Sequence, residues 1–595
     1  MIWIPLVVAV PFLGAATLVV VGHALPRRAS DVIGIAGAGT AVVLAAILLA
    51  RVGAGTSVYW FGGWTPRAGS FPLGIAFAVD TFGATLALFV LTLVLAALVY
   101  SWRYMEETHH LYEVLMLLFG GAMAGFALSG DLFNMFVLFE LMSVAAFALA
   151  AYNVEETTAI QGAFNFAVTN TLGALFVLTG IALVYGRTGS LNLAEIGRRL
   201  GSDGRHDGLV IVAFGLIVCG FLVKAAIVPF HFWLADAYAI APAPVCLLFA
   251  AVMSDLGIYG IARVYWVAFD GVLGQFEDPL RDVLLGVGAV TAVLGAVMAV
   301  LQRHLKRLLA YATISDLGCF LIGVALLTPD GVAGTGAWVV AHGLAKGSLF
   351  LAGGILLVTK GSIDEIVLHG KGRDRRWSAL AWAAAALALA GPPFLGTWPG
   401  HALVDDAATQ LGRGWIPVLL AAVTIVSTAA IVRAGLRVFL GLGPRTDRLL
   451  SPEPDEAPPA QDEPPSLALM QAVAVTLAVA SLALGAVTSL GAHAKEAAHR
   501  FTDGDAYRAL VLDHTPLPPA PAAHWATSAQ GVVWGLVCLA GSFALALGLL
   551  YRSRVVPAAV FRPLKAVHSG HVGDYVAWLT FGVAVIGGAF ALALR

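Results

Sequence analysis

Long apolar runs recur along the whole chain, and they constrain its fold more than any other feature of the sequence. A transmembrane helix needs about 20 mostly apolar residues, and about sixteen runs of that kind leave little sequence for a soluble domain. The runs are continuous rather than alternating, which excludes a β-barrel. They lie near 2–22, 31–50, 76–101, 111–129, 131–151, 160–185, 209–231, 243–268, 282–302, 308–327, 334–358, 378–396, 415–441, 467–490, 529–551 and 573–594. We therefore predict an all-α polytopic membrane protein with about 14 to 16 transmembrane helices.

Charge and cysteine content narrow the class of protein further. Only 12% of the 595 residues are charged, against roughly 25% in soluble domains, and the net charge is −2. These values exclude a soluble enzyme, a disordered chain and a nucleic-acid binder. The four cysteines are far apart, and no CxxC, P-loop or GxGxxG opening a soluble fold is present. We expect no metal centre, no disulfide framework and no bound redox cofactor.

Basic residues between the spans predict the orientation in the membrane. One side collects Arg27, Arg28, Arg103, Arg303, Lys306, Arg307, the basic residues of 371–376, Arg445, Arg448 and those of 552–565. Cytoplasmic loops carry the excess of lysine and arginine. This side is therefore predicted to be cytoplasmic, with both termini facing outward from a bacterial-type cytoplasmic membrane.

Ionisable residues near the middle of apolar spans are the candidate functional groups. They are Glu140, Lys224, Asp255, His342 and Lys346; Lys306 begins a span that holds Asp316 deeper inside, and His401 and Asp405 lie nearer a span end. Each costs at least ~2.5–3.5 kcal/mol on insertion scales, so each is expected to face protein or water. Any one of them can be a static ion pair, and Lys306 and Asp405 can be interfacial anchors. Together, acids and bases at similar depth indicate a proton relay.

Two spans carry helix-breaking residues. Pro229 follows Lys224 by five residues, and Pro392 and Pro393 open a Gly/Pro-rich segment over 390–401. Proline removes a helix hydrogen bond, and interrupted spans at corresponding places in two halves point to a transport site. Since five spans separate the two breaks, we predict two inverted five-helix repeats.

The predicted organisation follows from these repeats. Its segments are N-terminal helices over 1–110, the two repeats over 111–268 and 282–441, a proline- and acid-rich loop over 443–466 and a C-terminal transmembrane extension over 467–595.

Five stretches of this sequence together resemble one membrane-protein family. They are LFNMFVLFELMS, VKAAIVPFHFWLADAYAIAPAPV, LKRLLAYATISDLG, AHGLAKGSLFLAGG and GPPFLG, and they cover roughly 110–440. The chain resembles the antiporter-like membrane subunits of respiratory complex I, membrane-bound energy-converting hydrogenases and multisubunit cation/proton antiporters. Its tail, LKAVHSGHVGDYVAWL, is similar to that of the long hydrogenase-type and complex I subunit L-type members.

The resemblance implies roles for single residues. It gives Glu140 and Lys224 the part of a coupled pair that gates a proton path, and it adds Lys306, His342 and Lys346 to that path. Two positions depart from the family pattern. Asp255 stands where relatives carry a base, and Gly400 stands near the place of a second lysine or glutamate.

These departures leave alternatives open. Either the path runs through Asp255 and His401, or this member couples differently or does not pump. Asp255 can pair with Lys224 or Lys346, stay protonated in an apolar pocket, or bind a cation. We favour pairing, because an unpaired buried charge is the costliest arrangement.

The function implied by the resemblance is a proton-translocating subunit of a multisubunit redox-driven complex. Its partners would be other membrane subunits, the lipid bilayer and protons, with no nucleic acid. It would be at most a non-catalytic subunit of an oxidoreductase, of the NADH–quinone or hydrogenase type, because electron transfer would occur in partner subunits. The alternatives are a subunit of a Na⁺/proton antiporter and a non-pumping energy-coupling subunit for a soluble partner.

Overall fold

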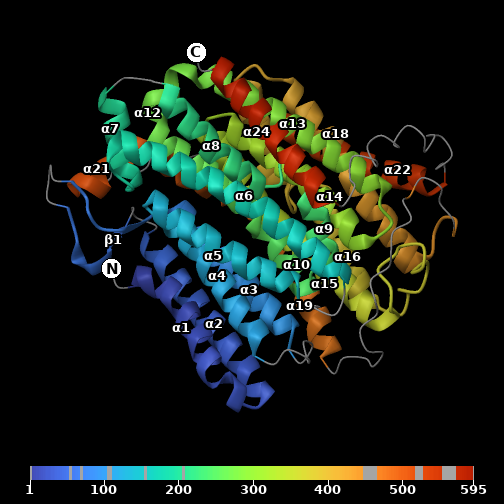
Figure 1. Cartoon of the computed structure of the whole chain (residues 1–595). Helices are drawn as coiled ribbons and strands as arrows, with labels where there is room; N and C mark the ends of the chain where they lie inside the picture. Colours follow the sequence, from blue (N-terminus) through green and yellow to red (C-terminus); the bar gives the residue numbers. More distant parts are fainter. Residues whose placement is uncertain are drawn as a thin grey trace.

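The computed structural model describes most of the chain as a bundle of helices (Figure 1). The described residues are 3–52, 57–66, 71–102, 110–152, 157–203, 208–445, 450, 466–515, 525, 527–551 and 571–593. Most of the predicted loop over 443–466 and the basic residues of 552–565 lie outside this set.

Long helices alternate in direction through the first half of the bundle. They are α1 (Trp3–Val21), α2 (Arg27–Val52), α3 (Thr81–Tyr100), α4 (Leu111–Leu128), α5 (Leu132–Ala150), α6 (Thr157–Thr188), the interrupted pair α8 (Gly208–Lys224) and α9 (Phe232–Ile240), and a pass built of α10 (Ala243–Leu248), η3 (Phe249–Met253), α11 (Asp255–Val264) and η4 (Tyr265–Phe269). Short turns η1 (Gly22–Ala24), η2 (Phe61–Gly63), α12 (Asp270–Leu273) and η5 (Gly274–Phe276) lie between passes.

The second half of the bundle is also made of long helices, and three further passes follow it. Its elements are α13 (Glu277–Leu301), α14 (Leu305–Ala325), α15 (Pro329–Lys360), the interrupted pair α16 (Arg376–Leu389) and α17 (Trp398–Gln410), α18 (Trp415–Gly435) with η6 (Leu436–Leu440), then α19 (Leu467–Gly485), α22 (Ala529–Tyr551) and α24 (Val572–Ala593).

The number of passes agrees with the prediction from the sequence. Thirteen described helical segments are long and apolar enough to cross a membrane, and one of them, 243–301, is 59 residues long. Counting that segment as two passes, and adding the two interrupted helices that begin with α8 and α16, gives sixteen. The prediction of an all-α polytopic membrane fold is confirmed, apart from one small hairpin.

That hairpin corrects the predicted start of the third span. Residues 76–79, assigned from the sequence to a helix, form strand β2 (Ala76–Val79), which pairs antiparallel with β1 (Ser57–Trp60). The helix begins only after Asp80, whose carboxylate accepts a hydrogen bond from the Gly83 N–H at 2.7 Å. An apolar strand followed directly by an apolar helix reads as one unbroken apolar run in the sequence. The boundary between them is set by the helix N-cap, Asp80.

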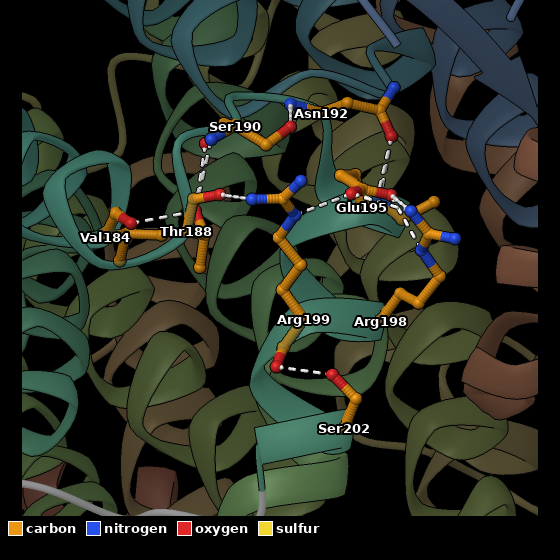
Figure 2. Close-up of polar contacts among 9 residues, drawn as sticks. Val184, Thr188, Ser190, Asn192, Glu195, Arg198, Arg199 and Ser202 are labelled. Atoms are coloured by element: carbon orange, nitrogen blue, oxygen red, sulfur yellow. Dashed lines mark hydrogen bonds and ion pairs between the residues drawn. The ribbon is translucent and has the colours of Figure 1, made fainter. Parts of the chain in front are cut away.

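A short polar helix, α7 (Leu193–Asp203), follows α6 and packs against η4, α12 and α21 (Gly504–Asp513). Figure 2 shows Glu195, which is fully buried, accepting hydrogen bonds from Arg198 and Arg199. Arg199 also donates to the Thr188 carbonyl at the end of α6. These contacts hold the α6–α7 connection, and Asn192 in it pairs with Asp131 before α5.

Small residues allow α13 and α14 to pack closely against each other. A Cβ on Gly295 of α13 would lie 2.3 Å from the Ser315 nitrogen, and one on Gly318 of α14 would lie 2.4 Å from the Ala292 nitrogen. Such approach is typical of membrane helices that pack through small residues. It fixes α14, and with it Asp316, against the rest of the bundle.

The C-terminal extension contains more than transmembrane helices. Besides α19, α22 and α24, it forms α20 (Leu490–Thr502) and α21 (Gly504–Asp513), whose sequences alternate apolar and charged residues. α20 packs against α15 and α3, and α21 packs against α7. In Figure 1, α21, α7 and β1 lie at the same end of the bundle.

Candidate functional site

Lys224 ends the first half of an interrupted helix. α8 stops at this residue and α9 begins at Phe232, so the segment 225–231, which contains Pro229, is not helical. The side chain is fully buried and donates a hydrogen bond to the Ser143 hydroxyl on α5 at 2.8 Å. Its Nζ also lies 5.3 Å from the Phe139 ring centroid, within the range of a cation–π contact.

Glu140 lies one helical turn from Ser143 on α5. It is half-buried, and its Oε1 is enclosed without a hydrogen-bond donor in the part of the chain that the structure describes. The carboxylate interacts electrostatically with Lys224. Lys224 therefore bonds to α5 through Ser143, which lies one helical turn away from Glu140. Glu140 is the acid with which Lys224 was predicted to couple.

Asp255 does not pair with either lysine, and this prediction was wrong. Its side chain is buried, and both carboxylate oxygens lack a hydrogen-bond partner among the described residues. Lys224 is turned to Ser143, and Lys346 lies against Asp316. Asp255 interacts instead with the like charge of Asp316.

The acid that organises the second half is Asp316 on α14. Its Oδ2 lies 3.0 Å from His342 Nε2 and 3.0 Å from Lys346 Nζ, both on α15. His342 and Lys346 are almost completely buried, and their i, i+4 spacing puts them on one helix face, as predicted. Asp316 was visible in the sequence as a mid-span acid but was not among the predicted site residues.

A second interruption separates α16 from α17. The segment 390–397 is not helical, it contains Pro392 and Pro393, and Gly391 and Gly396 have positive φ values of 61° and 56°. Glycine supplies such conformations without a steric penalty. The chain thereby turns so that His401 on α17 reaches the middle of the bundle.

His401 and Asp405 continue the polar groups along α17. The His401 ring centroid lies 3.4 Å from that of Trp338, and the imidazole interacts electrostatically with Asp316 and His342. Asp405 is one turn further on, buried, with an Oδ1 that has no hydrogen-bond partner in the described residues. Next to it, Asp406 accepts a hydrogen bond from Ser528 at 2.9 Å.

Lys306 occupies a different place from the other candidates. Its Nζ donates to the carbonyls of Ala239 and Ala241 at 3.2 and 2.9 Å, at the C-terminal end of α9. A cation is favourable there because helix carbonyls lack partners at that end. These two bonds fasten α14 to the first interrupted helix.

Both interruptions are covered by C-terminal helices. A Cβ on Gly582 of α24 would lie 2.4 Å from Pro229, and one on Gly535 of α22 would lie 2.9 Å from the Gly391 carbonyl. Unpaired backbone exposed to lipid costs several kcal/mol per group. The glycines let each helix close tightly over one break.

We refer to eight of these groups as the polar line. They are Glu140, Lys224, Asp255, Asp316, His342, Lys346, His401 and Asp405. The weakest connection along the polar line is between Lys224 and Asp255, which are linked through the close packing of their helices. A Cβ on Gly257 would lie 3.0 Å from the Ala225 nitrogen. Within the described residues, no cluster of three or more His, Cys, Asp or Glu side chains could hold a metal ion.

Two family models match this chain, and one of them covers the region that holds the polar line. The model described as the transmembrane part of NADH:quinone oxidoreductase and Mrp antiporters matches residues 129–428. The chain belongs to this family. A second model, described as the N-terminus of chain 5 of complex I, matches residues 64–112.

Individual members of the family show the same relationship. NADH-quinone oxidoreductase subunit N of Desulforudis audaxviator is 32% identical over 406 residues, which are 66% of this chain and 78% of the relative. A protein of Staphylococcus aureus named as an antiporter subunit is 30% identical over 385 residues, 64% of this chain and 74% of the relative. A chain of the Mrp complex from Dietzia superposes with a TM-score of 0.74 at 26% identity, covering 86% of this chain and all of that one.

Proposed function

We propose that this chain is a proton-translocating, antiporter-like membrane subunit of a larger redox-driven complex of the complex I or membrane-bound hydrogenase type. The observation that carries the proposal is the polar line, which places acids and bases in the middle of the bundle between two interrupted helices. Groups of this kind inside a membrane are costly and mark ion pathways. Electron transfer belongs to partner subunits.

The roles of single residues follow from their contacts. Glu140 and Lys224 form the first coupled pair, with Ser143 as the hydroxyl that Lys224 leaves when it moves toward the acid. Asp316 holds His342 and Lys346 as the second group. Proton transfer between the two groups passes Asp255 and requires water or a side-chain movement, since packing alone joins Lys224 to it.

The order of the elements supports the two inverted repeats. Each repeat has five passes, and the fourth is interrupted in both: α8 and α9 over 111–268, and α16 and α17 over 282–441. Because five is odd, α4 and α13 begin on opposite faces. The basic residues at 303–307 and 371–376 lie on one face, which supports a cytoplasmic assignment for it and outward termini in a bacterial inner membrane.

A second candidate function is a subunit of a cation/proton antiporter. The similarity to the Staphylococcus aureus protein and to the Mrp complex favours it, and the two unpartnered oxygens of Asp255 are ligands suited to a hard cation. Purification of the tagged chain from its own membrane, followed by identification of the bound subunits, separates the two. Hydrogenase or dehydrogenase subunits support the first function, and small antiporter subunits support the second. A lone soluble partner supports a non-pumping role.

Replacing Asp255 tests proton transfer between the first coupled pair and the second group, which is centred on Asp316. In Asp255→Asn the amide fills nearly the same volume but cannot pass a proton, and no ion pair is lost because Asp255 forms none with the described residues. We expect an unchanged or higher midpoint of thermal unfolding together with a severalfold loss of proton flux in proteoliposomes. Asp282→Asn, in an exposed pair with Arg413, is the control. If Asp255→Asn leaves flux, pH profile and Na⁺ dependence unaltered, the path bypasses this residue.

A further inference from the structure

α24 lies along the whole of the first interrupted pass, on both sides of the break. Near the C-terminal end of α24, the Phe590 ring centroid lies 6.1 Å from that of Phe214 on α8. Near its middle, a Cβ on Gly582 would lie 2.4 Å from Pro229 and 2.5 Å from Phe230, so the helix backbone packs directly on the break. α24 uses a single face for these contacts, because its buried residues recur every three or four positions. They are Tyr575, Leu579, Gly582, Ile586 and Phe590.

Tyr575, near the start of α24, fixes α9 through its ring and its hydroxyl. The ring stacks on that of Phe232 with centroids 5.5 Å apart, and the hydroxyl donates a hydrogen bond to Asp236 Oδ2 at 2.5 Å. The other oxygen of this carboxylate, Oδ1, lies 2.9 Å from Arg307 of α14. Hydrogen bonds to an ionised carboxylate are shorter and stronger than neutral ones. Asp236 is therefore the point at which α9 is held from two sides.

The two halves of the interrupted pass are held by different neighbours. α8 packs closely against α6, since a Cβ on Gly220 would lie 2.5 Å from the Gly173 carbonyl oxygen. α9 is fastened to α14 by Arg307 and by the bonds of Lys306 to the end of α9. Because 225–231 is not helical, no continuous ladder of helix hydrogen bonds fixes one half relative to the other. Their relative position depends on elements that contact both halves, and α24 is one of them.

We propose that Tyr575 and Gly582 are positioning residues for Lys224, the last residue of α8. Gly582 lets α24 lie on the break, and Tyr575 holds α9 through Asp236. The end of α8 is thereby kept in place relative to α9, so that Lys224 can leave Ser143 for its acid without the break opening. A helix that only anchored the chain in lipid would need neither the buried hydroxyl nor the glycine. This positioning role rests on the proposed function, and it means that the C-terminal extension sets the geometry of the first coupled pair.

Two valine variants on α24 test the contact with the break. Gly582→Val adds a side chain that must displace α24 from Pro229, whereas Gly588→Val adds the same side chain where no neighbouring element among the described residues lies within 4 Å of the Cβ. Both changes carry the same cost in helix propensity. Amide hydrogen exchange is measured in the assembled complex in lipid nanodiscs. We expect exchange over 225–231 to rise severalfold in Gly582→Val alone, while exchange over 390–397, which α22 covers, stays at the wild-type rate in both variants.

Tyr575→Phe tests the hydroxyl alone. Phenylalanine keeps the ring stacking and loses the hydrogen bond to Asp236. Tyr551→Phe, at a tyrosine that is 63% exposed on α22, is the control. We expect faster exchange over 225–231 and a severalfold lower proton flux in Tyr575→Phe, with a changed pH profile of flux because Lys224 is displaced. A simple loss of folded complex would lower flux in equal proportion at every pH.

Wild-type exchange over 225–231 in both Gly582→Val and Tyr575→Phe overturns the positioning role, and so does Tyr575→Phe with wild-type flux and pH profile. Either result leaves the proposed function intact. If Gly582→Val does not assemble, Tyr575→Phe decides, since it adds no atom to the contact. If the wild-type complex itself carries no flux, the proposed function fails. The hold of α24 on the break is then judged by exchange alone: faster exchange over 225–231 supports it, and wild-type exchange overturns it.

Discussion

Asp316→Asn is expected to abolish proton flux and to destabilise the protein. Among the described residues, Asp316 is the only acid within ion-pair distance of Lys346, so the change removes that charge, and it also weakens the bond to His342. Breaking a buried pair by removing one partner costs about 3–5 kcal/mol, because the remaining charge is left uncompensated. The midpoint of thermal unfolding in detergent and the flux in proteoliposomes should both fall.

One further variant separates the charge of Asp316 from its volume, and another serves as a control at an exposed pair. Asp316→Glu keeps the charge and should recover part of both stability and flux. Asp374→Asn breaks a pair with Lys360 in which the acid is 53% exposed, and such pairs contribute about 0–1 kcal/mol, so it should change neither. Full flux in Asp316→Asn would show either that His342 and Lys346 conduct protons without this acid, or that they take no part in proton conduction.

Glu140→Gln is expected to stop ion coupling in a folded protein. Glutamine is nearly isosteric and keeps the packing of α5, but it cannot take up or release a proton at physiological pH. No hydrogen bond to the buried Oε1 is lost, because the described residues supply none. Flux should fall to the level of protein-free vesicles while the unfolding midpoint stays close to that of the wild type.

Glu496→Gln on α20 is the matched control, because this acid is 39% exposed and pairs with Arg500 one turn away on the same helix. It should retain wild-type flux. A Glu140→Gln complex that transports normally would remove Glu140 from the path. One that fails to assemble would mean that the carboxylate stabilises the subunit, and the coupling role would then have to be given up.

The sequence predicts the passes and both breaks well, because each depends on local physics. A run of about 20 apolar residues is a sufficient signal for a membrane helix, and Pro229, Pro392 and Pro393 lie where α8 and α16 have ended. The hairpin at residues 76–79 was missed because its apolar residues continue into α3 without a change in composition.

The partners of the buried charges could not be predicted in the same way. Depth along a span follows from the sequence, but which acid meets which lysine depends on helix rotation and on close contacts such as Gly295 against Ser315. Lys346 therefore meets Asp316 rather than Asp255. The covering of both breaks by α22 and α24 is likewise a long-range result of packing.

The central claim is that protons move along the polar line, and Lys224→Met tests it most directly. Methionine keeps most of the apolar length of the side chain and removes the charge that reaches Ser143 and Glu140. The measurement is the pH change inside proteoliposomes that contain the assembled, driven complex, with Lys371→Met as a control on a lysine outside the described helices. Our account predicts no pH change above protein-free vesicles for Lys224→Met and a normal one for Lys371→Met. A wild-type pH change in Lys224→Met, with all subunits bound, would contradict it.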